Sequence, residues 1–137
     1  MKRVLVDTNI ILDLLSQRIK FFEASQDFFT YALDNDIELY VSTLSFANIH
    51  YILKEQLKLS KVRQSLRKFK ALVKVASFDD KALELALEEG FGDFEDGVQY
   101  YIAIENSCQA IITRNKKDFK KSSIPILNAA EFVNLNK

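Results

Sequence analysis

A short apolar run near the N-terminus ends abruptly in three polar residues, and this junction constrains the fold more than any other stretch of the chain. Residues 3–6 are rich in valine and leucine, which is typical of a buried strand. Asp7, Thr8 and Asn9 follow directly, and these residue types favour turns and helix starts. In open parallel sheets, ligands bind beyond the carboxyl ends of the strands. We therefore expect Asp7 at such an edge, followed by a helix over residues 9–16 that Thr8 caps.

Strand-like and helix-like segments alternate along the rest of the chain. Apolar or alternating runs predict strands at residues 37–41, 73–78, 110–113 and 124–127. Helical spacing predicts helices at 20–35, 43–56, 60–72, 81–89, 93–107 and from 128 onward, with Gly90 to Gly92 ending the fourth of these. Pro125 lacks a backbone N–H and places the last strand at a sheet edge. This alternation predicts an α/β fold with a mainly parallel sheet covered on both faces, in one domain over residues 1–137.

Composition narrows the class of protein. A chain of 137 residues with 48% hydrophobic content can bury a sizeable core without disulfides, and Cys108 is its single cysteine. Because no apolar run is long enough to span a bilayer or to form a signal peptide, we expect a cytoplasmic protein with no membrane partner. The formal net charge is zero, but Lys and Arg dominate residues 54–74 and acids dominate residues 79–96. These runs suit phosphate and metal binding respectively, and equally two solvated helix faces.

A parallel sheet would bring acids from three parts of the chain to one rim. These parts are Asp7, the helix start at residues 93–96, and the loop at residues 113–118. Carboxylates without cysteine, in a chain with a single histidine, His50, suit a hard cation such as Mg²⁺. Such an ion activates water and offsets charge on a phosphate, so the cluster indicates phosphodiester cleavage.

Each acid also has a simpler structural explanation when it is taken alone. Asp93 can cap its helix, and Asp96 is a favourable charge in the first turn of that helix. Taken singly, three other acids are expected to be surface charges: Asp13, Glu95 and Asp118. Only the joint position of these side chains with Asp7 favours a functional interpretation.

The order of three motifs resembles the PIN-domain family over nearly the whole chain. The motifs are Val6-Asp7-Thr8-Asn9, Phe94-Glu95-Asp96, and Thr113-Arg114-Asn115 followed by Asp118-Phe119. The chain is most similar to the small stand-alone members that act as toxin ribonucleases of VapBC-type toxin-antitoxin pairs. The resemblance implies a three-layer α/β/α sandwich, Mg²⁺- or Mn²⁺-dependent endoribonuclease activity on RNA, a small antitoxin protein as partner, and a homodimer.

The resemblance also implies roles for single residues. The catalytic, metal-binding acids would be Asp7, Asp96 and Asp118, with Asp93 as a further metal-binding helper; in other members the last acid falls at the position of Asn115. Supporting polar residues would be Thr8, Asn9, Asn48, Thr113 and Asn115. Candidates for RNA-phosphate contacts are Arg114, Lys116 and Lys117, although exposed loops are commonly rich in lysine.

One position departs from the pattern of the family. Asn48 stands where the family usually has a glutamate on the helix after the second strand. An amide oxygen can still coordinate a cation, but it carries no charge and cannot act as a base. The alternative function is therefore a catalytically weakened PIN-like module that binds RNA or protein.

A third interpretation is a phosphorylatable signalling receiver, which also places acids at the ends of parallel strands. It expects an acidic pair at the first strand and a lysine after the last one. The chain has Asp7 alone at the first position and Asn128 at the second, so this interpretation ranks last.

Overall fold

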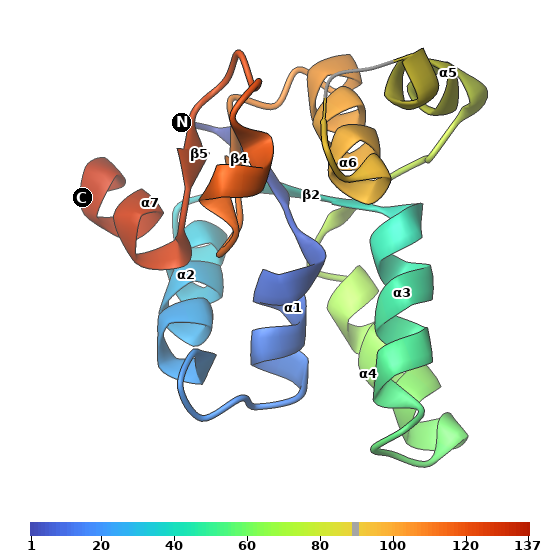
Figure 1. Cartoon of the computed structure of the whole chain (residues 1–137). Helices are drawn as coiled ribbons and strands as arrows, with labels where there is room; N and C mark the ends of the chain where they lie inside the picture. Colours follow the sequence, from blue (N-terminus) through green and yellow to red (C-terminus); the bar gives the residue numbers. More distant parts are fainter. Residues whose placement is uncertain (89–90) are drawn as a thin grey trace.

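A five-stranded parallel sheet forms the centre of the computed structural model, which describes residues 1–88 and 91–137 (Figure 1). Its strand order is β3-β2-β1-β4-β5. The strands are β1 (Arg3–Val6), β2 (Glu38–Ser42), β3 (Lys74–Ala76), β4 (Ala110–Ile112) and β5 (Ile126–Leu127). The predicted parallel sheet is confirmed, and the strand that follows Pro125 lies at an edge as expected.

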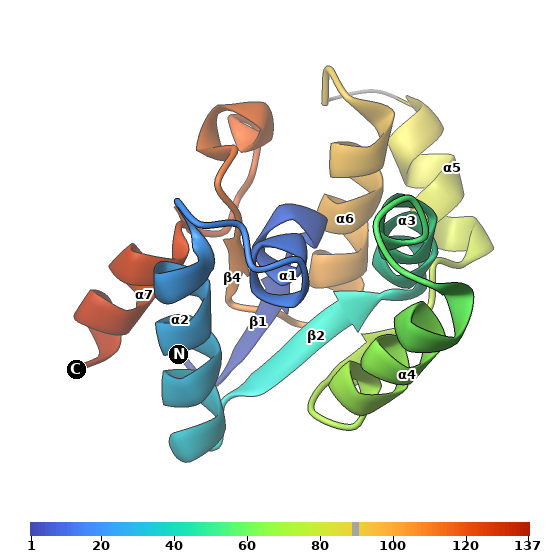
Figure 2. The same cartoon turned by 90° about the horizontal axis from the view of Figure 1, so that it is seen from below.

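Helices cover both faces of this sheet, as the three-layer prediction requires. One face carries α5 (Asp80–Glu88) and α6 (Phe94–Glu105), next to the short 3₁₀ helix η1 (Lys116–Phe119). The other face carries α1 (Thr8–Leu15), α2 (Phe22–Asp34), α3 (Thr43–Leu53), α4 (Leu59–Lys70) and α7 (Ala129–Asn136). In Figure 2 α1 lies between α2 and α3 over the middle of the sheet. The predicted end of the helix at residues 89–90 lies outside the described residues.

The central strand is buried on both of its faces. Val4 and Val6 point toward the layer of α1 and α2, while Leu5 points toward α6, and all three are fully buried. Two-sided burial explains why residues 4–6 form a continuous apolar run rather than an alternating one. No helix in the described part of the chain is long and apolar enough to cross a membrane.

The strand register brings three polar residues together at the carboxyl edge of the sheet. Val6 pairs with Ile112 of β4, so Asp7 and Thr113 follow side by side. Leu5 pairs with Tyr40 of β2, which places Ser42 in the same row. The backbone N–H of Asp7 donates to the carbonyl of Ile112 at 2.9 Å and extends this pairing by one residue.

The start of α1 differs from the sequence-based expectation. Asp7, not Thr8, is the N-cap residue, and its carboxylate accepts a hydrogen bond from the Thr8 N–H at 2.8 Å. Thr8 already has helical backbone, and its hydroxyl instead forms a 2.8 Å hydrogen bond with the Ser45 hydroxyl of α3. The prediction failed because both residue types can cap a helix, and the length of β1 decides which of them does so.

Candidate active site

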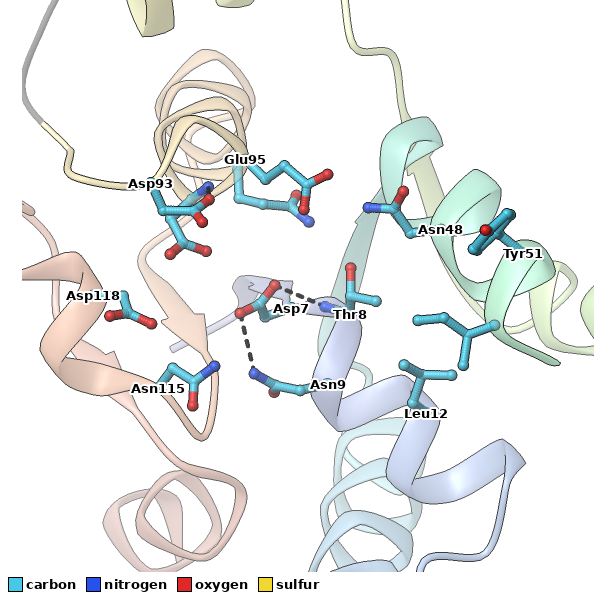
Figure 3. A pocket seen from close by; sticks show the side chains of 13 residues that line it. Asp7, Thr8, Asn9, Leu12, Asn48, Tyr51, Asp93, Glu95, Asn115 and Asp118 are labelled. Atoms are coloured by element: carbon cyan, nitrogen blue, oxygen red, sulfur yellow. Dashed lines mark hydrogen bonds between the residues drawn. The ribbon is translucent and has the colours of Figure 1, made fainter. Parts of the chain in front are cut away.

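A pocket of about 510 Å³ opens at the carboxyl edge of the sheet, between α1, α3, α6 and the start of η1 (Figure 3). Its walls contain the four predicted metal-binding acids, Asp7, Asp93, Asp96 and Asp118. The other lining residues are Thr8, Asn9, Leu12, Asn48, Tyr51, Ile52, Glu95, Gln99 and Asn115. Tertiary structure therefore gathers side chains from the first, middle and last thirds of the chain into one site.

Asp7 lies at the base of this pocket and is held by hydrogen bonds. Its side chain is only 6% exposed. Besides the bond from the Thr8 N–H, its Oδ2 accepts a hydrogen bond from the Thr113 hydroxyl at 2.8 Å. The Thr113 hydroxyl oxygen in turn accepts one from the Asn115 N–H at 3.0 Å, and the Asn9 amide lies 3.4 Å from Asp7 Oδ2. These contacts fix the orientation of the Asp7 carboxylate.

The pocket holds more negative charge than its surroundings neutralise. Burial raises the pKa of Asp7, hydrogen bonds from Thr113 and Thr8 lower it, and the charges of Asp118 and Asp93 raise it. Burial, then repulsion from Asp7 and Asp93, raises the pKa of Asp96 to about 7. Among the residues that the structure describes, none of the ion pairs includes one of these four acids. A bound cation would relieve this repulsion.

The donors of the pocket fit a hard divalent cation held partly through water. No group of three acidic, histidine or cysteine side chains in the described part of the chain is already arranged around one ion. Mg²⁺ is typically bound in proteins by one or two carboxylates and keeps several waters, so the carboxylates of this pocket would hold it partly through water. The buried Gln99 also lines the pocket, and its Oε1 has no hydrogen-bond partner within the described residues. A water on the ion would supply the donor that this oxygen lacks.

Gln99 belongs to a polar network that the sequence did not reveal. Its Nε2 donates to the Ser45 hydroxyl at 2.7 Å, and that hydroxyl also bonds Thr8 of α1. Ser42, the N-cap of α3, lies 3.2 Å from the same oxygen. The network ties α1, α3 and α6 together beneath the pocket. The available sequence signal was the three-residue spacing of Gln99 from Asp96, which places both on one face of a helix.

Asn48 lies on the α3 wall of the pocket, one helical turn beyond Ser45. Its amide faces the cavity opposite the acids of α6 (Figure 3). Asn48, which was predicted as a supporting polar residue, therefore lines the pocket. His50 does not line this pocket.

The basic residues of the loop after β4 have different environments. The Arg114 guanidinium donates hydrogen bonds to both carboxylate oxygens of Asp13, at 2.7 and 3.1 Å. Its central carbon lies 4.0 Å from the centre of the Phe21 ring. Lys116 pairs with Glu131 of α7 at 2.9 Å. Lys117 is exposed beside Asp118, in a hollow that Lys120 and Lys121 also line. The prediction of a surface charge at Asp13 is wrong, because its side chain is 1% exposed.

A PIN-domain family model matches residues 3–117 of the chain. The chain belongs to the PIN-domain family. Ribonuclease VapC1 of Aquifex aeolicus (strain VF5) is 26% identical to it over 136 residues, covering 96% of this chain and 93% of the relative. This agreement confirms the family that the three motifs indicated.

Solved structures share this PIN fold. The DNA-bound VapBC structure from Salmonella typhimurium matches with a TM-score of 0.72 at 15% identity, covering 94% of this chain and 99% of that one. VapC20 of Mycobacterium tuberculosis, a sarcin-ricin loop cleaving toxin, matches with a TM-score of 0.65 at 13% identity, covering 79% and 86%. At these identities the likeness establishes the fold, and the predicted α/β/α architecture is confirmed.

Proposed function

We propose that this PIN-domain protein is a metal-dependent endoribonuclease and the toxin of a VapBC-type toxin-antitoxin pair. The observation that carries the proposal is the buried Asp7 carboxylate, oriented by Thr113 at the base of a pocket whose other acids have no cationic partner among the described residues. The similarity to Ribonuclease VapC1 over nearly the full length of both chains supports the same activity.

The side chains of the pocket would have different roles in such a reaction. Asp7 and Asp96 would hold the metal, and Asp93 and Asp118, which line the same pocket, would bind its waters or a second ion. When bound, Mg²⁺ or Mn²⁺ lowers the pKa of a coordinated water and offsets the charge of the phosphate. Thr113 keeps the Asp7 carboxylate turned into the pocket. Of the three predicted phosphate contacts, Arg114 and Lys116 pair with acids, which leaves the exposed Lys117 as the one proposed to meet an RNA phosphate.

The partners follow from the same proposal. Several solved relatives are complexes of a toxin with its antitoxin, which supports a small antitoxin protein as partner here. We further propose a homodimer that acts on RNA in the cytoplasm.

The alternative is a catalytically weakened PIN-like module that binds RNA or protein. The observation that favours it is the neutral amide of Asn48 on the pocket wall, which contributes neither charge nor a base. Membership of the PIN family removes the receiver interpretation from consideration.

Cleavage of a mixed RNA pool by the purified protein, in Mg²⁺, Mn²⁺ and EDTA, tests the proposal. We expect cleavage only with metal, and its loss in Asp7→Asn and in Asp96→Asn. Asp27→Asn, which changes an exposed acid of α2, is the matched control and should cleave normally. Equal cleavage by all variants would reveal a contaminating nuclease, whereas RNA binding without turnover would favour the binding module. In that case, recovery of cleavage in Asn48→Glu would identify the missing carboxylate as the cause.

A further inference from the structure

The pocket continues beyond its acids along a wall formed by α3 and α1. Along this wall the lining changes from carboxylates to an amide, an aromatic ring and two aliphatic side chains (Figure 3). The residues are Asn48, Tyr51, Ile52 and Leu12. A hydrated cation gains nothing from aliphatic and aromatic surface, so this end of the pocket suits an organic group.

Tyr51 presents its ring at the outer end of that wall. It is 64% exposed although it lies on a helix that packs against the core, so its ring is not needed to fill the protein interior. The ammonium of Lys54, three residues further along, lies over one face of the ring, 4.7 Å from its centre, and places a positive charge there. Tyr51 and Asn48 are three residues apart in α3, so they lie on the same side of the helix.

Asn48 differs chemically from the glutamate usual at its position in a way that matters for a nucleic acid. A carboxylate could only accept hydrogen bonds and would repel a phosphate, whereas an amide both donates and accepts. Such paired donors and acceptors match the edges of nucleobases. Aromatic side chains beside them commonly stack with unpaired bases of single-stranded RNA.

We propose that Asn48 and Tyr51 form a nucleobase-binding subsite for the nucleotide next to the phosphate held at the acids. Tyr51 supplies the stacking surface, Asn48 bonds the edge of the base, and Leu12 and Ile52 line the space between them. The substrate class is single-stranded RNA, whose unpaired bases are free to stack on an aromatic side chain. This inference rests on the proposed function for the position of the phosphate.

The test measures the affinity of a fluorescent single-stranded RNA, in the Asp7→Asn background so that no cleavage occurs. Stacking of one base on an aromatic ring contributes enough that Tyr51→Ala should weaken binding by about 5- to 100-fold. Tyr51→Phe should stay within about 2-fold, because it keeps the ring. Asn48→Ala should reduce the discrimination between bases at one RNA position. Leu135→Ala is the matched control, because Leu135 is also 64% exposed but lies on α7, away from the pocket.

An RNA series that carries one abasic nucleotide at successive positions locates the contact. We expect one abasic position to weaken binding to the protein with Tyr51 and to leave binding to Tyr51→Ala unchanged. The subsite would be overturned if the protein with Tyr51 and Tyr51→Ala each bound intact and abasic RNA with equal affinity, while thermal melts showed both to be folded. A folded protein that binds no RNA would also overturn it. If the protein with Asp7 cleaves RNA while Tyr51→Ala binds normally, the ribonuclease proposal stands and the subsite fails. If no RNA is cleaved in any metal but the abasic effect appears, the subsite stands and the catalytic proposal fails.

Discussion

Asp13 of α1 and Arg114, which follows β4, form a partly buried two-point ion pair between residues 101 positions apart in the sequence, with N–O distances of 2.7 and 3.1 Å. The backbone N–H of Arg114 also donates to the side-chain oxygen of Asn9 at 3.2 Å. Because Asn9 lies beside Asp7, the ion pair fastens α1 to the segment that carries Thr113, whose hydroxyl also contacts Asp7. Its expected role is to hold Asn9 and Thr113, which both contact Asp7, in fixed positions relative to each other.

Removal of the arginine should strongly destabilise the fold. In Arg114→Met the buried Asp13 carboxylate loses both hydrogen bonds from Arg114 and keeps Arg18 at 3.7 Å, so we expect a loss of about 1–3 kcal/mol of unfolding free energy. Asp13→Leu/Arg114→Met removes both charges and should recover most of this loss. Urea unfolding measures the free energy of unfolding of each variant. Lys117→Met, an exposed change in the same loop, should shift stability by less than about 0.5 kcal/mol; a similarly small loss in Arg114→Met would contradict the role of the pair.

The Thr113 hydroxyl should set the metal affinity of the pocket without touching the metal. Its hydrogen bond lowers the pKa of Asp7, so Thr113→Val should raise that pKa and let protons compete better with the ion. We expect Mn²⁺ affinity to fall by about 10-fold, and more at pH 6 than at pH 8. Calorimetric titration at the two pH values measures this. Thr113→Ser keeps the hydroxyl and should bind Mn²⁺ as the unaltered protein does, and a pH-independent loss in Thr113→Val would speak against the mechanism.

Stability without metal should fall as the pH rises. The pKa of Asp96 is about 7 in the folded protein against 3.8 for an ordinary Asp, so the folded state keeps a proton that the unfolded state has released. The contribution of Asp96 to stability is therefore fully present below about pH 4 and is lost as the pH rises through about 7. In EDTA we expect a higher melting temperature at pH 5.5 than at pH 8, with a smaller difference in Asp96→Asn. Added Mg²⁺ should raise the melting temperature at pH 8 more than at pH 5.5. A flat pH profile in EDTA would show that Asp96 titrates normally.

The buried network beneath the pocket should behave as one unit. Ser45→Ala removes the acceptor of the Gln99 amide and the partner of the Thr8 hydroxyl, and we expect a loss of about 1–3 kcal/mol from the unsatisfied buried groups. If Gln99→Leu is added, the further loss should be smaller than that of Gln99→Leu alone, since the partner is already missing. Chemical unfolding of the four proteins gives the coupling energy, and strict additivity would argue that the two side chains act separately.

Most of the architecture could be predicted because its signals are local. The apolar run at residues 3–6, the alternation of strands and helices, and Pro125 before the last strand each report the environment of their own segment, and together they indicate a parallel sheet. Within such a sheet the carboxyl ends of the strands share one edge, so the joint location of Asp7 and Asp96 could be anticipated from chain order alone.

The remaining features depend on partners that lie far away in the sequence. Asp13 looks like a surface charge until folding buries it against Arg114, and Gln99 has no visible role until α6 packs beside Ser45. The N-cap of α1 is Asp7 and not the expected Thr8 for the same reason, because the pairing of β1 with β4 sets where the strand ends. The amino-acid sequence alone thus determined the sheet, its order of elements and the identity of the acids. Only the tertiary structure decided which polar groups are buried and paired, because burial and pairing depend on the surrounding packed elements and not on the residue itself.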